Sequence, residues 1–288
     1  MKKYLESLPQ DIKELVRICS QISTKNNANA YLVGGFVRDL ILGVPNFDLD
    51  IVIEGEGIKF AEELALCLCA KLVRHKRFGT ATILLKHHFK IDIATARKEH
   101  YPHPGSLPVV SPGELHDDLF RRDFTINALA IKINKNDFGS FVDLFQGRKD
   151  LENKKIRILH DLSFIDDPTR ILRAIRFKER YNFSFEKNTS VLLKSAVKKK
   201  MLEKVEPQRL RDEIILMLKE KEPFKHIRSL QKNAGLGFIN AHLGLSKETS
   251  SLFVSLKKEL AWFNSKFPHH RQIDAWLVYL TALTEKLP

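Results

Sequence analysis

The stretch YLVGGFVRDLILGVPNFDLDIVIEG, residues 31–55, decides the fold of this chain. The apolar residues 31–33 predict a strand, the glycine pair after them predicts a tight turn, and residues 36–42 predict a helix. A turn over residues 43–46, which contains glycine, proline and asparagine, leads into a second predicted strand over residues 47–53. Two strands joined through a short helix are therefore expected to lie side by side.

The second predicted strand carries Asp48 and Asp50, and the turn after the first strand carries Gly34 and Gly35. Side chains alternate across a strand, so carboxylates at i and i+2 leave the same face. Two neighbouring carboxylates repel each other, and a hard divalent cation such as Mg²⁺ resolves that conflict. Glycines at a helix N-terminus bring bare backbone N–H groups toward a phosphate. Together these features predict nucleoside triphosphate chemistry with Mg²⁺.

Each feature alone has an ordinary structural interpretation, a tight turn for the glycines and solvated carboxylates for Asp48 and Asp50. Their combination, joined by Val37-Arg38-Asp39, is far more specific. The pattern GG-x-VRD followed by D-x-D resembles the tRNA nucleotidyltransferase / poly(A) polymerase family, class II, within the polymerase-β-like nucleotidyltransferase superfamily. The resemblance implies that Gly34, Gly35 and Arg38 bind the triphosphate.

Composition limits the classes of protein and partner. The chain has 288 residues, 43% of them apolar, and Lys and Arg exceed Asp and Glu by 13, which favours a polyanionic partner such as nucleic acid over an anionic membrane surface. The N-terminus lacks the apolar core of a secretory signal, and no apolar run reaches the roughly 18 residues of a membrane span. Three cysteines make a poor disulfide set. Cys67 and Cys69 are expected to be buried thiols in an apolar helix, and a cytoplasmic location is expected.

The rest of the N-terminal half predicts a mixed sheet with helices on one face. Apolar spacing predicts helices over residues 10–25 and 57–72, and residues 80–86 and 88–95 read as a strand pair. Asp92 lies on the second of these strands and is the candidate for a third catalytic carboxylate; the alternative is an edge-strand aspartate without a role. Residues 100–112, rich in proline, predict a long loop, and the resemblance implies that it helps the site switch between nucleotides.

The segment DLFRRDFTINALA, residues 118–130, is the most specific match to the family. Paired arginines ahead of what reads as an apolar helix can hold a triphosphate bidentately, with Arg122 as the candidate. Asp123 can orient an arginine, and Asn127 can donate to phosphate or ribose. The alternative for an arginine here is an ordinary surface cation. Residues 141–151 are expected to close the domain with a turn at Gly147.

The segment IDDPTRILRAIRF, residues 165–177, predicts a helix that Asp166 or Asp167 caps and that has proline in its first turn. Asp167 and Arg170 are i and i+3 and share a face. A carboxylate that accepts from the exocyclic amino group of C or A, beside a guanidinium that donates to ring acceptors, can select these bases over G and U. The resemblance identifies 166–170 as the nucleotide-selecting motif. The alternative is an ordinary capped helix with an intrahelical salt bridge.

Basic residues continue along this helix and beyond it. Arg173 and Arg176 are candidates for nucleotide binding, and the lysines of residues 192–204 are candidates for contact with the RNA backbone; a merely solvated face is the alternative. Another helix begins near residue 207, and residues 241–260 and 273–283 read as packing helices. The expected architecture is α+β, with a catalytic head over residues 1–150, a helical neck over 151–220 that selects the nucleotide and binds RNA, and a partial helical body over 221–288.

These features predict a template-independent, Mg²⁺-dependent nucleotidyltransferase. Asp48 and Asp50, with Asp92 as a third carboxylate, are expected to serve catalysis, and Asp48 and Asp50 to hold the metal. The resemblance implies addition of C and/or A from CTP or ATP to the 3′ CCA end of tRNA with release of pyrophosphate. CC-only addition, A-only addition and poly(A) synthesis share these motifs. A more distant alternative is a non-catalytic RNA-binding protein of this fold, which the retained Asp48 and Asp50 oppose. The sequence does not indicate an oligomeric state.

Overall fold

A computed structural model describes residues 1–46, 48–85, 89–270, 273–285 and 287 of the chain. It divides into two compact units: residues 1–102, 108–153 and 157–159 form the first, and residues 103–107, 154–156 and 160–288 form the second. No helix within the described ranges is long and apolar enough to cross a membrane.

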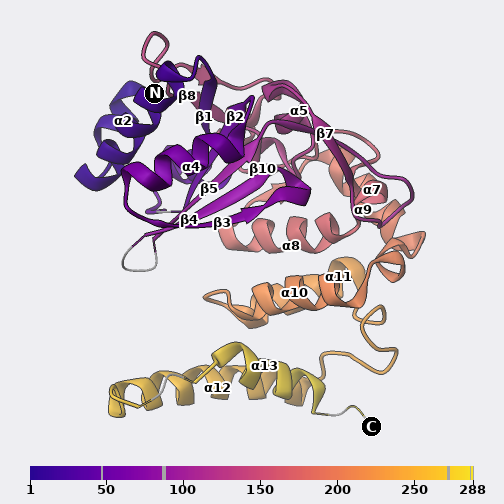
Figure 1. Ribbon diagram of the computed structural model, residues 1–288. Coiled ribbons are helices and arrows are strands. Elements are labelled where there is room, and N and C mark those ends of the chain that lie inside the picture. The colour runs from indigo at the N-terminus through magenta and orange to yellow at the C-terminus, as the bar shows by residue number, and fades with distance from the viewer. Residues whose placement is uncertain (47, 86–88, 271–272, 286, 288) are drawn as a thin grey trace. The chain divides into compact units, whose positions relative to one another are not determined.

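A seven-stranded mixed sheet forms the centre of the first unit (Figure 1). Its strand order is β3-β4-β5-β2-β1-β8-β9, and β2 and β5 are parallel while the other neighbours are antiparallel. The strands are β1 Asn29–Val33, β2 Leu49–Glu54, β3 Lys71–His75, β4 Thr80–Leu84, β5 Lys90–Thr95, β8 Ala130–Lys132 and β9 Phe141–Val142. The predicted mixed sheet is thus confirmed, and the predicted strand residues 47, 86 and 88 lie outside the described part of the chain.

Helices α1 Lys2–Glu6, α2 Gln10–Lys25, α3 Gly34–Leu42, α4 Gly57–Cys67, α5 Leu115–Phe120 and α6 Gly147–Glu152 complete this unit, with 3-10 turns η1 Lys76–Phe78 and η3 Thr125–Asn127. Helix α2 has the predicted bounds because its apolar residues recur at helical spacing and are buried. Helix α4 packs against β4 and β5, next to α2. On the opposite face, Leu115 and Leu119 of α5 share a core with Tyr31 and Val52.

Three local predictions for this unit were wrong. The helix expected over residues 57–72 ends at Cys67, and Leu72 lies in edge strand β3. Cys67 and Cys69 are exposed, and only Cys19 is a buried cysteine within the described ranges. The apolar helix expected after Arg122 is instead the short turn η3 followed by β8, which pairs with β1 and β9 in the sheet. Gly147 packs closely against this turn, since an added Cβ would lie 2.1 Å from the Thr125 carbonyl oxygen.

The loop predicted over residues 100–112 is shorter in the structure. Its ends belong to strands β6 Arg97–His100 and β7 Val109–Pro112, which pair antiparallel in the first unit. Residues 101–108 between them contain no helix or strand. Residues 103–107 belong to the second unit, where the Gly105 N–H donates to the Asp166 carbonyl at 3.2 Å and the Gly105 carbonyl accepts from Arg209 at 3.1 Å.

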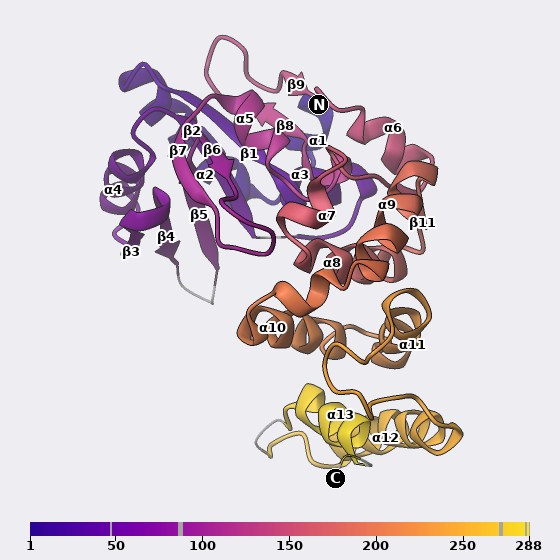
Figure 2. The same ribbon diagram turned by 90° about the vertical axis from the view of Figure 1, so that its right-hand side faces the viewer.

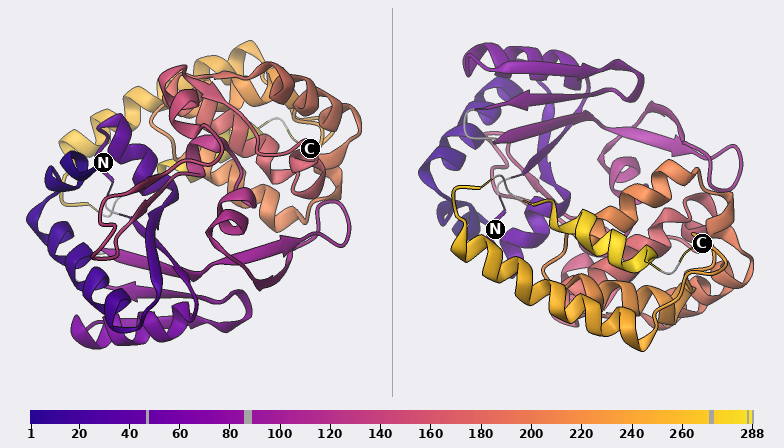
Figure 3. Two further views of the ribbon diagram at one scale, coloured as in Figure 1. Left: turned by 90° about the horizontal axis from the view of Figure 1, so that it is seen from above. Right: turned by 90° about the horizontal axis from the view of Figure 1, so that it is seen from below.

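The second unit is helical apart from the short parallel pair β10 Lys155–Ile156 and β11 Ser184–Phe185. Its helices are α7 Ser163–Asp166, α8 Thr169–Tyr181, α9 Lys187–Lys198, α10 Pro207–Leu218, α11 Pro223–Ala234, α12 Lys247–Lys266 and α13 Ala275–Thr284, with the 3-10 turn η4 Met201–Lys204. Helix α8 packs against α10 and α11 (Figure 2). Helix α12 packs against α13 (Figure 3), and it covers residues 247–266 instead of the predicted 241–260.

Candidate active site

The two sequence motifs of the first unit meet where β1 passes into α3. Gly34 has a φ of +71°, and an added Cβ would lie 2.6 Å from Arg122 Nη1 and 3.4 Å from Asp50 Oδ2. Only glycine can therefore bring this turn so close to both side chains. The Gly34 N–H donates to the Leu129 carbonyl at 3.2 Å, so it is not the bare amide that the sequence suggested. The amide of Gly35 lies in the first turn of α3, where backbone N–H groups have no intrahelical acceptor.

Asp50 and Asp92 lie side by side on the parallel strands β2 and β5, in direct register. Burial, together with the neighbouring carboxylates of Asp92 and Asp48, raises the pKa of Asp50 to about 6, although Arg122 and Lys90 oppose the rise. Asp48 is exposed and lies just before β2, where its N–H donates to Asn46 Oδ1 at 2.9 Å. The structure thus brings the three predicted carboxylates to one end of the neighbouring strands.

A hollow of about 330 Å³ is lined by Asp50, Asp92, Thr82, Arg121 and Arg122, among others. Arg122 Nε is buried, and it has no hydrogen-bond partner in the described part of the protein. A buried donor without an acceptor is costly and calls for an anionic or polar ligand. This guanidinium lies beside the carboxylates and could donate hydrogen bonds to the phosphate oxygens of a metal-bound triphosphate.

Asp118 holds Arg122 in place. Its fully buried carboxylate accepts from Arg122 Nη2 at 3.0 Å and from Arg121 Nη2 at 2.6 Å. Burial alone would raise the pKa of Asp118, but Arg122 and Arg121 lower it below its ordinary value. Glu99 accepts from Arg121 in turn, at 3.1 Å. Sequence reasoning gave Asp118 no role, although its helical spacing of three and four residues from the two arginines was a usable signal.

Arg38, Asp123 and Asn127 form a connected network behind the hollow. Arg38 is buried, donates twice to Asp39, each at 2.8 Å, and donates to the Asn127 amide oxygen. Asn127 donates to Asp123 Oδ1 at 2.8 Å. Arg38 was predicted to bind the triphosphate, and its hydrogen bond to Asn127 connects α3 to the segment after Arg122. Nucleotide binding by these three residues stays a prediction.

Asn46 extends this network to the D-x-D segment. It donates to Asp39 at 2.8 Å and accepts the backbone N–H of Asp48. The turn that precedes Asp48 is therefore tied to α3. The sequence analysis used Asn46 only as a turn residue.

The carboxylates suit a divalent cation by their chemistry, since hard oxygen donors are what Mg²⁺ prefers. Burial is the main cause of the raised pKa of Asp50, and the carboxylates of Asp92 and Asp48 add to it. The described residues contain no group of three or more His, Cys, Asp or Glu side chains arranged to hold a metal ion. Asp92 already accepts from Thr82 at 2.6 Å and from Lys90 at 2.9 Å. Metal binding by Asp48 and Asp50 stays a prediction.

The predicted base-selecting residues lie in the second unit, each with partners of its own. Asp167 Oδ1 accepts from Thr169 Oγ1 at 2.6 Å and from Arg209 Nη2 at 2.8 Å. The N-cap position of α8 is Pro168, so neither Asp166 nor Asp167 takes the predicted place. Arg170 is buried and donates to Ser163 Oγ at 2.6 Å. Sequence reasoning missed Arg209 and Ser163, whose contacts come from tertiary placement.

Arg173 and Arg176, the other candidates on α8, reach α10. Arg176 is buried and pairs with Glu213 at 3.2 Å and with Glu220 at 3.6 Å, while Arg173 pairs with Glu213 at 3.3 Å. These contacts connect two helices of the second unit. A role in nucleotide binding stays a prediction for both arginines.

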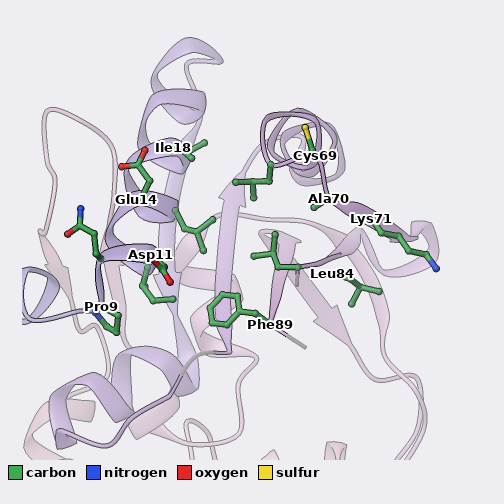
Figure 4. Close-up of a pocket in the computed structure, with 14 residues that line it drawn as sticks. Pro9, Asp11, Glu14, Ile18, Cys69, Ala70, Lys71, Leu84 and Phe89 are labelled. Carbon is green, nitrogen blue, oxygen red and sulfur yellow. The ribbon is translucent and has the colours of Figure 1, made fainter. Parts of the chain in front are cut away.

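A larger hollow of about 990 Å³ lies elsewhere in the first unit and shares no residue with the first (Figure 4). Its lining is mainly apolar and comes from α2, from the residues after α4 and from the ends of β4 and β5; it includes Leu15, Ile18, Leu84 and Phe89. Exposed Cys69 lies at its edge. None of the predicted site residues lines it.

Comparison with known proteins places this geometry in a family. Residues 30–157 match the poly(A) polymerase head domain. A solved structure of a CCA-adding enzyme in its apo form II superimposes with a TM-score of 0.89 at 42% identity, covering 100% of this chain and 67% of that one. The chain belongs to the tRNA nucleotidyltransferase / poly(A) polymerase family. The predicted fold, a polymerase-type head followed by helices, is confirmed.

Two further relatives are informative. An A-adding tRNA nucleotidyltransferase of Geobacter sulfurreducens is 42% identical over 281 residues, which cover 98% of this chain and 32% of that protein. A tRNA nucleotidyltransferase solved with a primer tRNA and an incoming ATP analogue gives a TM-score of 0.81 at 38% identity, covering 93% of this chain and 75% of that one. The chain spans less than two-thirds of the length of the first curated relatives that it matches, between 31% and 57%.

Proposed function

We propose that this chain carries the catalytic and nucleotide-selecting parts of a tRNA nucleotidyltransferase, which transfers C and/or A from CTP or ATP to the 3′ CCA end of tRNA and releases pyrophosphate. The observation that carries the proposal is the meeting of Gly34, Asp50 and Arg122 at one point, with a buried arginine donor unpartnered in the described residues beside a carboxylate of raised pKa. Glycine, cation and carboxylate together match a triphosphate and its metal.

Each group has a defined task in this proposal. The first turn of α3, including Gly35, and the Arg122 guanidinium bind the phosphates, and Asp118 keeps Arg122 oriented toward them. Asp48 and Asp50 would hold Mg²⁺, which when bound activates a 3′-hydroxyl and neutralises charge on the departing pyrophosphate. Asp92 completes the set of catalytic carboxylates. Asn127 and Asp123, one hydrogen bond apart, are placed to contact the ribose or the phosphates.

The second unit is proposed to select the base. Asp167 uses Oδ1 for Thr169 and Arg209, which leaves Oδ2 to accept from the amino group of C or A. Arg170 supplies donors for the ring acceptors, with Ser163 as its fixed support. The exposed lysines of α9, together with a net charge of +13, support contact with RNA. The neck and body division at residue 220 and a cytoplasmic location remain predictions.

The relatives support several members of this reaction class. Proteins named A-adding and CCA-adding are each 42% identical to this chain, so identity does not separate the alternatives. CC-only addition and poly(A) synthesis use the same site chemistry. A non-catalytic RNA-binding role is disfavoured by the intact carboxylates and by Arg122.

One experiment separates these outcomes. The protein is incubated with each labelled nucleotide in turn and with three acceptors: tRNA that lacks the CCA end, tRNA ending in CC, and oligo(A). We expect C and/or A, and neither G nor U, on a tRNA acceptor, and at least a thousandfold loss in Asp50→Asn with the fold retained by circular dichroism. Elongation of oligo(A) alone would assign poly(A) synthesis, and activity unchanged in Asp50→Asn would reject the metal assignment.

A further inference from the structure

Lys90 lies two residues before Asp92 on β5, inside the carboxylate cluster. Its Nζ donates to Asp92 Oδ2 at 2.9 Å, and Thr82 Oγ1 donates to Asp92 Oδ1 at 2.6 Å. Both oxygens of Asp92 therefore already have a donor from the chain itself. Asp50, directly opposite on β2, remains with a raised pKa.

The register of three strands produces this arrangement. Thr82 pairs with Asp92 across β4 and β5, and Asp92 pairs with Asp50 across β5 and β2. Residues at i and i+2 of a strand share a face, so Lys90 leaves β5 on the side of Asp92. The Lys90 ammonium also attracts the carboxylates of Asp48 and Asp50. A fixed cation thus stands among the three acidic side chains that were predicted to bind metal or catalyse.

Lys90 differs from a fully solvated surface lysine because it is ion-paired with Asp92. Its side chain is 44% exposed and that of Asp92 is 37% exposed, so the pair is open to an incoming ion. A cation that reaches Asp48 and Asp50 meets the positive charge of Lys90 in addition to that of Arg122. Coulomb repulsion between the Lys90 charge and a divalent ion lowers the affinity of the site for the ion.

We propose that Lys90 occupies the third carboxylate in the nucleotide-free protein. A divalent cation is then held by Asp48 and Asp50, and it reaches Asp92 only by displacing the ammonium. Lys90 is in this sense a positioning residue that sets the metal affinity of the resting site. The inference rests on the proposed metal site, and it assigns a role to a lysine outside the motifs of the family.

The test measures Mn²⁺ binding to the full chain without nucleotide or RNA, from the electron paramagnetic resonance signal of the free ion. Replacing Lys90 by methionine preserves the length of the side chain and removes its charge. We expect the dissociation constant for Mn²⁺ to fall about tenfold in Lys90→Met, because one nearby unit charge no longer opposes the ion. Lys90→Arg should stay close to wild type.

The double variant Lys90→Met/Asp92→Asn, compared with Asp92→Asn alone, separates occupation of Asp92 from a general charge effect. If Lys90 withholds Asp92 from the metal, Lys90→Met should leave the dissociation constant for Mn²⁺ almost unchanged in the Asp92→Asn background, whereas a general charge effect would give the gain there as well. A gain that persists in that background, or no gain in Lys90→Met alone, would overturn the proposal. Lys59→Met is the matched control, since Lys59 pairs with Glu56 at an exposed site on α4 and its loss changes the net charge equally.

Asp50→Asn distinguishes failure of this inference from failure of the proposed function. Loss of Mn²⁺ binding in Asp50→Asn with no response to Lys90→Met keeps the metal site and rejects the role of Lys90. Binding that is equal in wild type and Asp50→Asn rejects both, because there is then no metal at these carboxylates for Lys90 to oppose.

Discussion

Arg122 of the catalytic unit and Arg176 of the helical unit are both buried or partly buried, and both were predicted to bind nucleotide. Arg176 has a glutamate on each side, Glu213 and Glu220, and its ring neighbour Phe177 lies under the guanidinium at 4.9 Å. Arg122 shares Asp118 with Arg121, and its Nε is one of two orphaned buried side-chain atoms in the described residues. Arg176 thus has carboxylate partners in the helical unit, whereas the buried Nε of Arg122 has no hydrogen-bond partner in the described residues of the first unit.

The difference shows that features which destabilise the folded state are concentrated around the proposed nucleotide site. An unpartnered buried donor and a carboxylate of raised pKa are both costs to the folded state, and they occur together around Gly34. The α8–α10 contacts of the helical unit pair opposite charges. Sequence motifs alone do not distinguish the two arginines. Their contacts do, because Arg122 keeps a buried donor without a partner in the described residues, whereas Arg176 forms ion pairs with Glu213 and Glu220.

Of the changes that test the two arginines, Arg122→Lys should have the larger effect. Lysine keeps the charge beside Asp118 but cannot present the planar pair of donors that a phosphate accepts from arginine. We expect kcat/KM for the nucleotide to fall about a hundredfold, with the larger part in transition-state binding. Steady-state kinetics measures this, and Arg148→Lys, at an exposed pair with Glu152, is the control. Unchanged kinetics would mean that Arg122 is as structural as Arg176.

A smaller effect, on stability, is expected from Arg176→Met. The change leaves Glu213 with Arg173 and Glu220 with Arg180, so each glutamate keeps one partner. The free energy of unfolding should therefore fall by about 2 kcal/mol, less than the loss of a buried ion pair without substitutes. Urea denaturation measures this. A tenfold rise in KM for ATP with unchanged stability would instead place Arg176 at the nucleotide.

Sequence patterns predicted the parts that local rules determine. The spacing of Ile12, Leu15 and Cys19 predicted α2 at its observed bounds, and the strand–glycine–helix pattern placed Gly34 near Asp50. Those features need only the periods of helix and strand and the conformational freedom of glycine. The local signal was accordingly sufficient. Arg122 was added to the site from the separate segment 118–130 and its resemblance to the family.

Other features depend on contacts between segments far apart in the chain and could not be predicted from the sequence. Strand β3 is a short edge strand whose side chains are exposed or half-buried, so its sequence has no clear strand period. Lys90 was passed over because its partner depends on the register of three strands, and Arg209 because it meets Asp167 from another helix. Arg38 and Arg176 are likewise buried by residues far away in the sequence. The number and spacing of charged residues do not predict such burial.

The smallest predicted effect tests whether the ionised Asp50 carboxylate destabilises the folded state. The pKa of Asp50 is about 6 in the folded protein against an ordinary value of 3.8, so above pH 6 folding must ionise a group that prefers its proton. Asp50→Asn removes that cost and should raise the unfolding free energy by about 1 to 2 kcal/mol at pH 8. The gain should shrink as pH falls through 6 and vanish only below about pH 3, where Asp50 is protonated in both the folded and the unfolded state. Thermal unfolding in EDTA across this range measures it, with Asp212→Asn, exposed on α10, as the control. A variant that is destabilised at pH 8 would show that the Asp50 carboxylate supports the fold, as the glutamates around Arg176 do.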